Sequence, residues 1–312
     1  MREEREISFF YDFHTPPYGG GNQFLLALKQ EFQRCGVGVR VNEITGKTLA
    51  CLFNSYNLDF STLERTLKKH PSCRVIHRVD GPISLYRGTD DGTDSAIFTW
   101  NAKLADVTIF QSCWSLKESL QAEFRPKHPV VIHNAVDASI FHSRCRIEFS
   151  SQRKIRLIST SWSDNPRKGA PFYEWLEEHL DWDRFDYTFV GRSPVRFKQI
   201  RQVDPQPSHG LANLLRQHDI YITASEKDPC SNALIEALAC GLPAVYLNDG
   251  GHPELAGNGG RPFTGREDIL KTIDDVINEY ALCTAHIAVT PIETTARKYL
   301  EVMCGNEQRA GS

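Results

Sequence analysis

Short apolar segments alternate with amphipathic segments along most of the chain. The first apolar segment, ISFFYDF (7–13), runs into the glycine-rich stretch HTPPYGGGN and predicts a buried strand followed by a loop. The next segment, QFLLALKQEFQRCG (23–36), places Phe24, Leu28 and Phe32 on one face of a helix. This order of strand, glycine loop and helix is the first half of a βαβ unit.

Further apolar segments predict two series of strands, with helical spacing in the segments between them. The first series is LACLFN (49–54), RVIHRVD (74–80), VTIFQS (107–112) and PVVIHNAVD (129–137). The second series is IRLISTS (155–161), DYTFVG (186–191), DIYITAS (219–225) and PAVYLN (243–248). Because strands alternate with helices, we expect an α/β fold with a parallel, doubly wound sheet in each half.

A polar, basic stretch, HSRCRIEFSSQRK (142–154), separates the two series. A single core stops growing at roughly 250–300 residues, so a chain of 312 residues favours two domains. We expect one Rossmann-like domain over residues 1–145, a second over 146–290, and a C-terminal helix within 291–312.

Composition narrows the class of protein. The formal net charge of −3 argues against bulk binding of nucleic acid. The nine cysteines are an odd number, widely spaced and without a CxxC pair, which disfavours a disulfide framework or a structural zinc site. The charged start MREEREISFF lacks the long apolar core of a signal peptide, and no apolar stretch is long enough to span a membrane. We therefore expect a cytoplasmic protein, with contact at the inner face of a membrane left open.

The stretch SEKDPCSNALIEALACGLPAVYLNDGGHPEL combines a helix start with two acids. Ser231 is a good N-cap for a helix over residues 232–240, and Gly241 is a good stop signal. Asp228 precedes that helix and Glu236 lies about one turn inside it. A helix start favours an anion, whereas carboxylates accept hydrogen bonds from hydroxyls. A sugar nucleotide offers both, since its pyrophosphate suits the helix start and its sugar hydroxyls suit the acids.

The same stretch resembles a known family. DPCSNALIE (228–236) is similar to the acid–seven residues–Glu motif of retaining, GT-B-fold glycosyltransferases of family four, and EALACGLPAVYLNDGGHPELAG continues the similarity. The family has Glu at the first position, where this chain has Asp228. The resemblance implies that Asp228 contacts the transferred sugar and that Glu236 holds the ribose hydroxyls. It also implies that the helix start binds the donor through Ser231, Asn232, Ala233 and Leu234.

The resemblance further implies two Rossmann-like domains that face a cleft, with the acceptor side in the first, the donor side in the second, and the last helix crossing back to the first. In this family an arginine and a lysine hold the donor diphosphate. Lys168 in STSWSDNPRKGAP matches the lysine, but Ser161-Trp162-Ser163 replaces the usual Gly-Arg-Leu, so that Arg167 is the substitute we expect.

The glycine loop PPYGGGNQF resembles a family loop that touches the donor phosphates, and this implies roles for Gly20 and Gly21. Read alone, the loop is equally well a tight turn. Its spacing is not GxGxxG, so a nicotinamide-dependent oxidoreductase is a distant alternative.

Polar residues also follow the strands of the first half. VIHRVDG places His77, Arg78 and Asp80 at the carboxyl end of a strand, where α/β sheets bind ligands. The resemblance implies that His77 lies near the donor sugar and that Asp80, with Arg78 and Asn134, faces the acceptor. A structural histidine at 77, and an Asn134 that only shapes the crossover between domains, are the alternatives.

No metal site emerges from the pattern. Asp90, Asp91 and Asp94 in RGTDDGTD lack the spacing and the final Glu of an EF-hand, and no Asp-x-Asp motif of the metal-dependent transferases occurs. We expect no obligatory metal and no cofactor besides a nucleoside-diphosphate sugar as donor substrate.

The resemblance therefore implies a metal-independent hexosyltransferase that retains the anomeric configuration. We expect the acceptor to be a glycan, a lipid-linked glycan or a protein. An epimerase or hydrolase on the same fold, and a non-catalytic subunit that binds nucleotide sugars, are the alternatives. The base and sugar of the donor, the linkage and the oligomeric state stay open.

Overall fold

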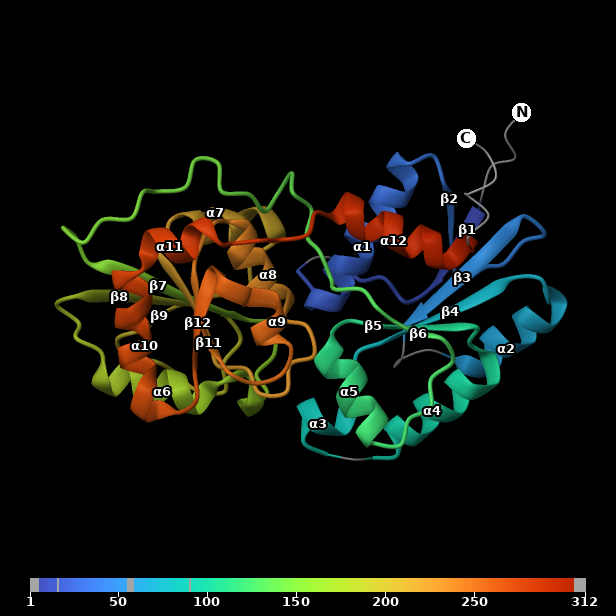
Figure 1. The fold of residues 1–312 in the computed structure, drawn as a ribbon, viewed down its shortest axis with the longest axis horizontal. Coiled ribbons are helices and arrows are strands. Elements are labelled where there is room, and N and C mark those ends of the chain that lie inside the picture. The colour runs from blue at the N-terminus through green and yellow to red at the C-terminus, as the bar shows by residue number, and fades with distance from the viewer. Residues whose placement is uncertain (1–5, 16, 55–58, 90, 306–312) are drawn as a thin grey trace. The chain divides into compact units, whose positions relative to one another are not determined.

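The structure is a computed structural model that describes residues 6–15, 17–54, 59–89 and 91–305. Within these residues the chain forms two compact units. The first unit contains the described residues of 6–14, 25–134 and 292–305, and the second contains those of 15–24 and 135–291. Each unit has its own sheet (Figure 1).

The first unit is built on a parallel sheet of six strands in the order β2-β1-β3-β4-β5-β6. The strands are β1 (Glu6–Phe10), β2 (Gly38–Val41), β3 (Thr48–Asn54), β4 (Arg74–Val79), β5 (Val107–Phe110) and β6 (Pro129–Val131). The helices are α1 (Gly20–Arg34), α2 (Phe60–Lys69), α3 (Ile83–Arg87), α4 (Thr93–Leu104), α5 (Cys113–Gln121) and α12 (Ile292–Cys304).

Alternating side chains of this sheet pack against two layers of helices, one on each face. Phe9 of β1 packs against Phe32 of α1, with ring centroids 5.8 Å apart. The next residue, Phe10, belongs to a buried cluster that includes Leu63 of α2. Since neighbouring residues of a strand point to opposite faces, α1 and α2 cover opposite faces of the sheet. α12, from the far end of the chain, contacts β3 and β4.

The second unit repeats this design with strand order β12-β11-β10-β7-β8-β9, again all parallel. The strands are β7 (Ile155–Ser161), β8 (Phe185–Gly191), β9 (Arg201–Val203), β10 (Ile220–Thr223), β11 (Ala244–Leu247) and β12 (Gly260–Phe263). The helices are η1 (Pro166–Lys168), α6 (Ala170–His179), α7 (Ser208–Arg216), α8 (Asn232–Ala239), α9 (His252–Ala256), η2 (Gly257–Gly259), α10 (Arg266–Asn278) and α11 (Tyr280–Ala285).

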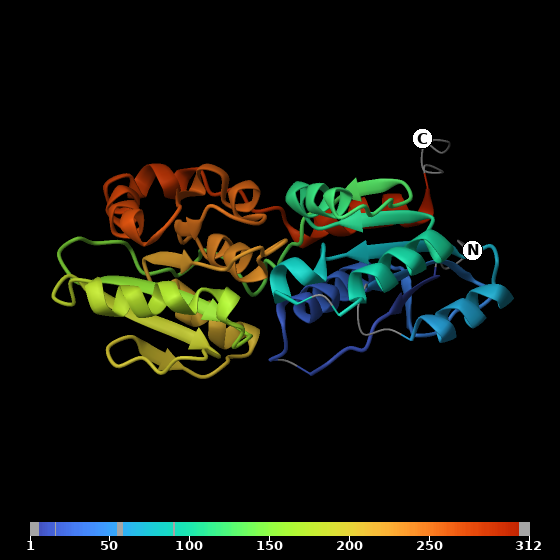
Figure 2. The ribbon, with the colours of Figure 1, turned by 90° about the horizontal axis from the view of Figure 1, so that it is seen from below.

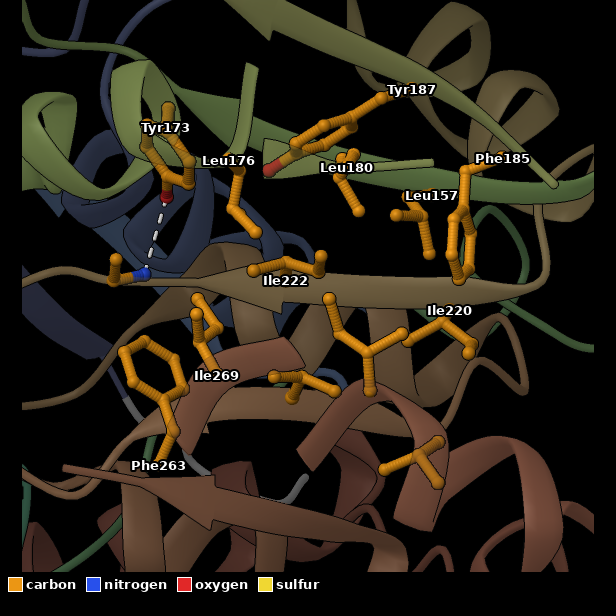
Figure 3. Close-up of a cluster of buried hydrophobic side chains, with 14 of the residues drawn as sticks. Leu157, Tyr173, Leu176, Leu180, Phe185, Tyr187, Ile220, Ile222, Phe263 and Ile269 are labelled. Atoms are coloured by element: carbon orange, nitrogen blue, oxygen red, sulfur yellow. Dashed lines mark hydrogen bonds between the residues drawn. The ribbon is translucent and has the colours of Figure 1, made fainter. Parts of the chain in front are cut away.

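Helices cover both faces of the second sheet (Figure 2). A buried cluster of side chains lies on each face. Leu157 of β7 joins side chains of α6 and α10, whereas the next residue, Ile158, joins side chains of α7 and α8. Figure 3 shows the first of these clusters, in which the amide of Ala224 donates a hydrogen bond of 3.2 Å to the Tyr173 hydroxyl. This bond satisfies a polar group that would otherwise destabilise an apolar core.

The basic stretch between the two strand series packs onto the second unit. Asp219 is fully buried just before β10 and accepts two hydrogen bonds from the Arg153 guanidinium, at 2.6 and 2.8 Å. The amide of Arg156 donates to the same carboxylate at 2.8 Å. A buried carboxylate needs such partners, so Asp219 fixes the stretch beside the second sheet.

The division between the units falls after residue 134, earlier than the boundary we expect at 145 from the sequence. Val136 and Phe141 explain the difference, because both side chains are buried in the second unit's core. Val136 also forms an isolated parallel bridge with Pro291, at the end of the second unit.

The expected α/β fold with two doubly wound parallel sheets is confirmed. β2, β9 and β12 were not predicted, and all three are edge strands of three or four residues. Edge strands are short and partly exposed, so they lack the continuous apolar run that marks a central strand. β2, for example, has three exposed residues of four.

The strand order of each sheet reverses at one point, between β1 and β3 in the first unit and between β7 and β10 in the second. In open α/β sheets, ligands bind at the carboxyl ends of the strands beside such a reversal point. The loops after β7, β10 and β11 carry the residues of greatest chemical interest in the second unit.

Candidate functional site

Three loops of the second unit are joined by backbone contacts at this reversal point. The amide of Glu226, after β10, donates to the carbonyl of Arg167, after β7, at 2.8 Å. The amide of Gly251, after β11, donates to the carbonyl of Asp228 at 2.9 Å. Gly250 has φ of +64°, and a Cβ there would lie 2.4 Å from the Asp228 carbonyl oxygen. Only glycine permits the third loop to approach this closely.

Lys168 reaches across from the first of these loops to Asp228. Its Nζ lies 2.8 Å from Oδ2 of Asp228. The lysine ends the short helix η1, whose start is capped by Asn165 and whose end is Gly169 with φ of +96°. A Cβ at Gly169 would lie 2.6 Å from the Cβ of Ala224, so the loop packs tightly on the end of β10. Sequence reasoning singled out both charged residues but not their ion pair.

The Asp228 carboxylate is ionised although it is almost fully buried. Burial acts to raise its pKa. The charge of Lys168 and the nearby His252 act to lower it, as do hydrogen bonds from Lys168 and from the Cys230 amide. These contributions outweigh burial, so the pKa is lowered. The Cys230 amide donates to Oδ1 at 3.2 Å. The site therefore holds one fixed negative charge beside one half-exposed cation.

α8 begins where the sequence predicts. Ser231 is its N-cap, and the Ser231 hydroxyl accepts a hydrogen bond of 3.3 Å from the Leu234 amide. The Leu234 amide is thereby occupied, whereas the Ala233 amide belongs to the first turn, which has no intrahelical acceptors. The positive end of the helix follows directly on the loop that carries Asp228, the partner of Lys168.

Glu236 lies within α8 and is buried. Burial raises the pKa of its carboxyl group from an ordinary value of 4.5 to about 8. The group is therefore mostly protonated at neutral pH. It becomes a carboxylate readily only if a ligand supplies hydrogen-bond donors, because such donors favour the charged form.

The glycine loop groups with the second unit and contacts the start of α8. A Cβ at Gly20 would lie 2.6 Å from Nδ2 of Asn232, so this position has no room for a side chain. Gly21, in contrast, has nothing within 4 Å of such an atom. Of the two glycines, Gly20 alone is required by close packing against α8.

Arg167 is half-buried beside Lys168. Its amide donates to the Asn165 side chain at 3.0 Å and its carbonyl accepts from Glu226. The backbone of Arg167 is thus part of the scaffold of the site.

His77 belongs to the core of the first unit. It is fully buried, its ring stacks on Phe53 with centroids 4.0 Å apart, and its Nδ1 accepts a hydrogen bond of 2.8 Å from the Asn101 amide group. Burial lowers its pKa to about 3. A ring without exposed surface contacts no ligand, so the structure gives no support to a role for His77 near a donor sugar and favours the alternative of a structural histidine.

Arg78, Asp80 and Asn134 meet in the first unit, together with Gln111, which the sequence analysis missed. Arg78 is fully buried and donates to Asp80 at 3.0 Å and to Asn134 at 2.8 Å. Asn134 donates to Gln111 at 2.7 Å, and Gln111 in turn donates to Asp80. The four side chains form a closed ring of hydrogen bonds in which the Asp80 side chain keeps a quarter of its surface exposed. Arg78 and Asn134 therefore orient Asp80 rather than present an open surface.

His252 is a second residue that the sequence analysis missed. It begins α9, directly after the Gly-Gly pair, and is fully buried. Its Nδ1 donates to the Leu247 carbonyl at 3.1 Å. Burial lowers its pKa, although the negative charge of Asp228 acts in the opposite direction. The Gly-Gly-His-Pro-Glu sequence was the available signal.

Among the described residues, no group of three or more His, Cys, Asp or Glu side chains is arranged to hold a metal ion. Asp90, one of the acids weighed for Ca²⁺, lies outside the described residues, and Asp94 caps a turn by accepting from the amides of Ile83 and Ser84. In that same part of the chain, every helix is too short or too polar to cross a bilayer.

Part of the chain is similar to a known family. Residues 198–287 match the sequence model of the family described as Glycosyl transferases group 1. The matched segment includes Asp228, Ser231, Glu236 and His252. No curated protein matches the sequence.

Solved glycosyltransferase structures share the fold over nearly the whole chain. HepE of Anabaena, determined with UDP and glucose, has a TM-score of 0.70 at 13% identity and covers 96% of this chain and 99% of its own. Sucrose-phosphate synthase from Thermosynechococcus elongatus has a TM-score of 0.70 at 12% identity, covering 97% and 96%. WaaG, a glycosyltransferase involved in lipopolysaccharide biosynthesis, has a TM-score of 0.67 at 14% identity, covering 96% and 100%. The GT-B fold and the resemblance to glycosyltransferases of group 1 are thus confirmed.

Proposed function

We propose that this protein is a retaining glycosyltransferase of family four that moves a sugar from a nucleoside-diphosphate sugar to an acceptor hydroxyl. The observation that carries the proposal is the meeting of Lys168, Asp228 and the capped start of α8 at the strand reversal of the second unit. The segment that matches the glycosyltransferase family begins at residue 198 and includes the last two of these.

In this proposal the second unit is the donor side. Lys168 and the first turn of α8 bind the diphosphate, with Arg167, Gly20 and Gly21 beside them. A diphosphate attracts Lys168 away from its ion pair with Asp228, because it carries more charge at the positive end of a helix. Positive groups fixed at this place stabilise the charge that grows on the departing phosphate.

The two acids bind hydroxyls. Asp228, once released by Lys168, accepts hydrogen bonds from the hexose, and Glu236 accepts hydrogen bonds from the ribose. Asn232, Ala233, Leu234 and the Ser231 cap shape the helix start between them. The buried setting of both acids strengthens these hydrogen bonds relative to the same bonds in water.

The chemistry then follows from the leaving group. The bond from the anomeric carbon to the phosphate oxygen breaks, its electron pair stays on the diphosphate, and an oxocarbenium-like centre forms. The acceptor hydroxyl attacks from the same face, and its proton passes to the departing phosphate. Since fixed cations of the chain stabilise the leaving diphosphate, we propose no metal ion and no cofactor. Retention is tested by the anomeric configuration of the product in NMR spectra.

Support for the donor class comes from structural neighbours with UDP-glucose and with UDP-2-fluoro glucose. For the acceptor we propose a glycan, a lipid-linked glycan or a protein. WaaG is involved in lipopolysaccharide biosynthesis and a pneumococcal neighbour is an O-GlcNAc transferase. We propose that the first unit is the acceptor side, with Asp80 oriented by Arg78 and Asn134, and that the protein acts in the cytoplasm or at the inner face of a membrane.

The test is a thermal-shift panel of UDP-, GDP-, ADP- and TDP-sugars, with and without EDTA, followed by product analysis. A ligand that binds only the folded state stabilises it by about 2.7 kcal/mol at a hundredfold excess over its dissociation constant. We expect one base to shift the unfolding temperature, and Glu236→Ala to abolish the shift. Hydrolysis without an acceptor would indicate the hydrolase alternative, and absence of any shift would contradict the proposal.

Lys168→Ala should lower turnover by on the order of 10²-fold or more, because it removes a cation that stabilises the leaving group. The matched control is Lys227→Ala, since Lys227 also forms an ion pair, at 3.0 Å with Asp249, and its loss should leave turnover unchanged. An unchanged turnover number in Lys168→Ala, measured with saturating donor, would remove Lys168 from the mechanism.

A further inference from the structure

Arg192 lies on the ring of Trp162 at the carboxyl edge of the second sheet. Its guanidinium carbon is 4.5 Å from the ring centroid. Trp162 directly follows β7 and begins the loop that ends at Lys168, and Arg192 directly follows the neighbouring strand β8. The Trp162 ring also contacts Tyr18, with centroids 5.5 Å apart.

The backbone fixes this arrangement. The Arg192 amide donates to the Ser161 carbonyl at 2.9 Å. Gly191 has φ of +119°, and a Cβ there would lie 1.8 Å from the same carbonyl oxygen. Because no other residue fits at 191, the ends of β7 and β8 are held together and Arg192 is placed over Trp162.

Arg192 differs from two nearby lysines in its partners. Two cations of neighbouring loops are paired with acids, Lys168 with Asp228 and Lys227 with Asp249. Arg192 is exposed and forms no ion pair with any residue in the described part of the chain. A guanidinium held over an aromatic ring keeps N–H groups that can donate to phosphate oxygens.

We infer that Arg192 is a further phosphate-binding residue of the donor site and that Trp162 is its positioning residue. The inference rests on the proposed function, since it supplies a further cation for the diphosphate besides Lys168 and Arg167. It also assigns a role to Ser161-Trp162-Ser163, the segment at which this chain departs from the pattern of the family it resembles. The ligand class is a nucleoside diphosphate, recognised through its phosphates.

The test uses inorganic pyrophosphate, which is independent of the unknown base, and then the nucleoside diphosphate that binds the wild-type protein. We expect Arg192→Ala to weaken both by roughly 10- to 100-fold, the usual loss for a charge-assisted hydrogen bond. Arg196→Ala is the matched control, because it removes the same charge from an exposed position in the same loop. Its affinities should equal those of the wild-type protein.

Trp162 is tested by rescue. Trp162→Ala should weaken pyrophosphate binding several-fold, as expected for loss of a cation–π contact, and Trp162→Phe should restore most of it. Equal affinities in Arg192→Ala and Arg196→Ala would overturn the inference while leaving the proposed function intact. If the wild-type protein binds neither pyrophosphate nor any nucleoside diphosphate, the proposed function and this inference fall together.

Discussion

Glu236 combines a buried carboxyl group with a proposed role as an acceptor of hydrogen bonds from ribose. Its pKa of about 8 means that the empty protein carries a proton there at neutral pH. Two hydroxyl donors stabilise the carboxylate, so donor binding in our proposal releases this proton. Glu236 thereby makes the affinity for the donor depend on pH.

We predict that affinity for the nucleoside diphosphate rises with pH, by up to about tenfold per unit below pH 8, and levels off above it. Calorimetry in buffers of different ionisation enthalpy at pH 7 should show release of nearly one proton. In Glu236→Gln, which cannot titrate, affinity should be weaker and this component of the pH dependence should be absent. Proton release that is equal in the two proteins would exclude Glu236 as its source.

Stability without ligand offers an independent check on the same group. Because the folded-state pKa is raised from 4.5 to about 8, the folded protein binds the proton more tightly, and Glu236 costs stability as pH rises through that window. The unfolding temperature of Glu236→Gln, compared with that of the wild-type protein, should therefore rise as the pH increases between these two values.

Sequence reasoning found site residues where the controlling contact is local. Ser231 caps an amide only three residues away. A serine followed by strong helix formers was enough to place the start of α8. The Lys168–Asp228 ion pair joins residues 60 apart, and no local pattern encodes it. The burial of His77 likewise depends on Phe53 and on Asn101, which lie on other elements.

At the scale of elements, glycines decide how closely strand ends and loops approach one another. Gly191 joins the ends of β7 and β8, and its φ of +119° lies in the region that other residues avoid. The apolar pattern predicted a strand ending there, but it did not indicate that Arg192 would be directed onto Trp162. Such contacts follow from the pairing of strands and not from the spacing of residues within one strand.

Gly191→Ala should destabilise the protein by at least about 1–3 kcal/mol, from backbone strain and from the clash with the Ser161 carbonyl. Denaturant unfolding measures this change. Gly21→Ala is the control for stability, because an atom added at Gly21 has nothing within 4 Å. Equal unfolding free energies for the two variants would show that the strand ends separate without cost.

At the scale of the whole molecule, the first unit is completed by residues from both ends of the chain. β1 lies within its sheet, and α12 packs on β3 and β4 after the chain has formed all of the second unit. The sequence analysis predicted a terminal helix, but the prediction that this helix crosses back to the first domain came only from the resemblance. The first unit therefore depends for its stability on a helix that follows the whole second unit in the chain.

Tyr299 tests this dependence because it is the fully buried aromatic residue of α12. Tyr299→Ala should cost about 3–5 kcal/mol, as other large-to-small core substitutions do, and the loss should fall on the first unit. Hydrogen exchange should accelerate in β3 and β4 and stay unchanged in β10 and β11. Glu301→Ala, an exposed change in the same helix, is the control. Equal acceleration in both sheets would mean that the two units unfold as one, so that α12 stabilises the molecule as a whole.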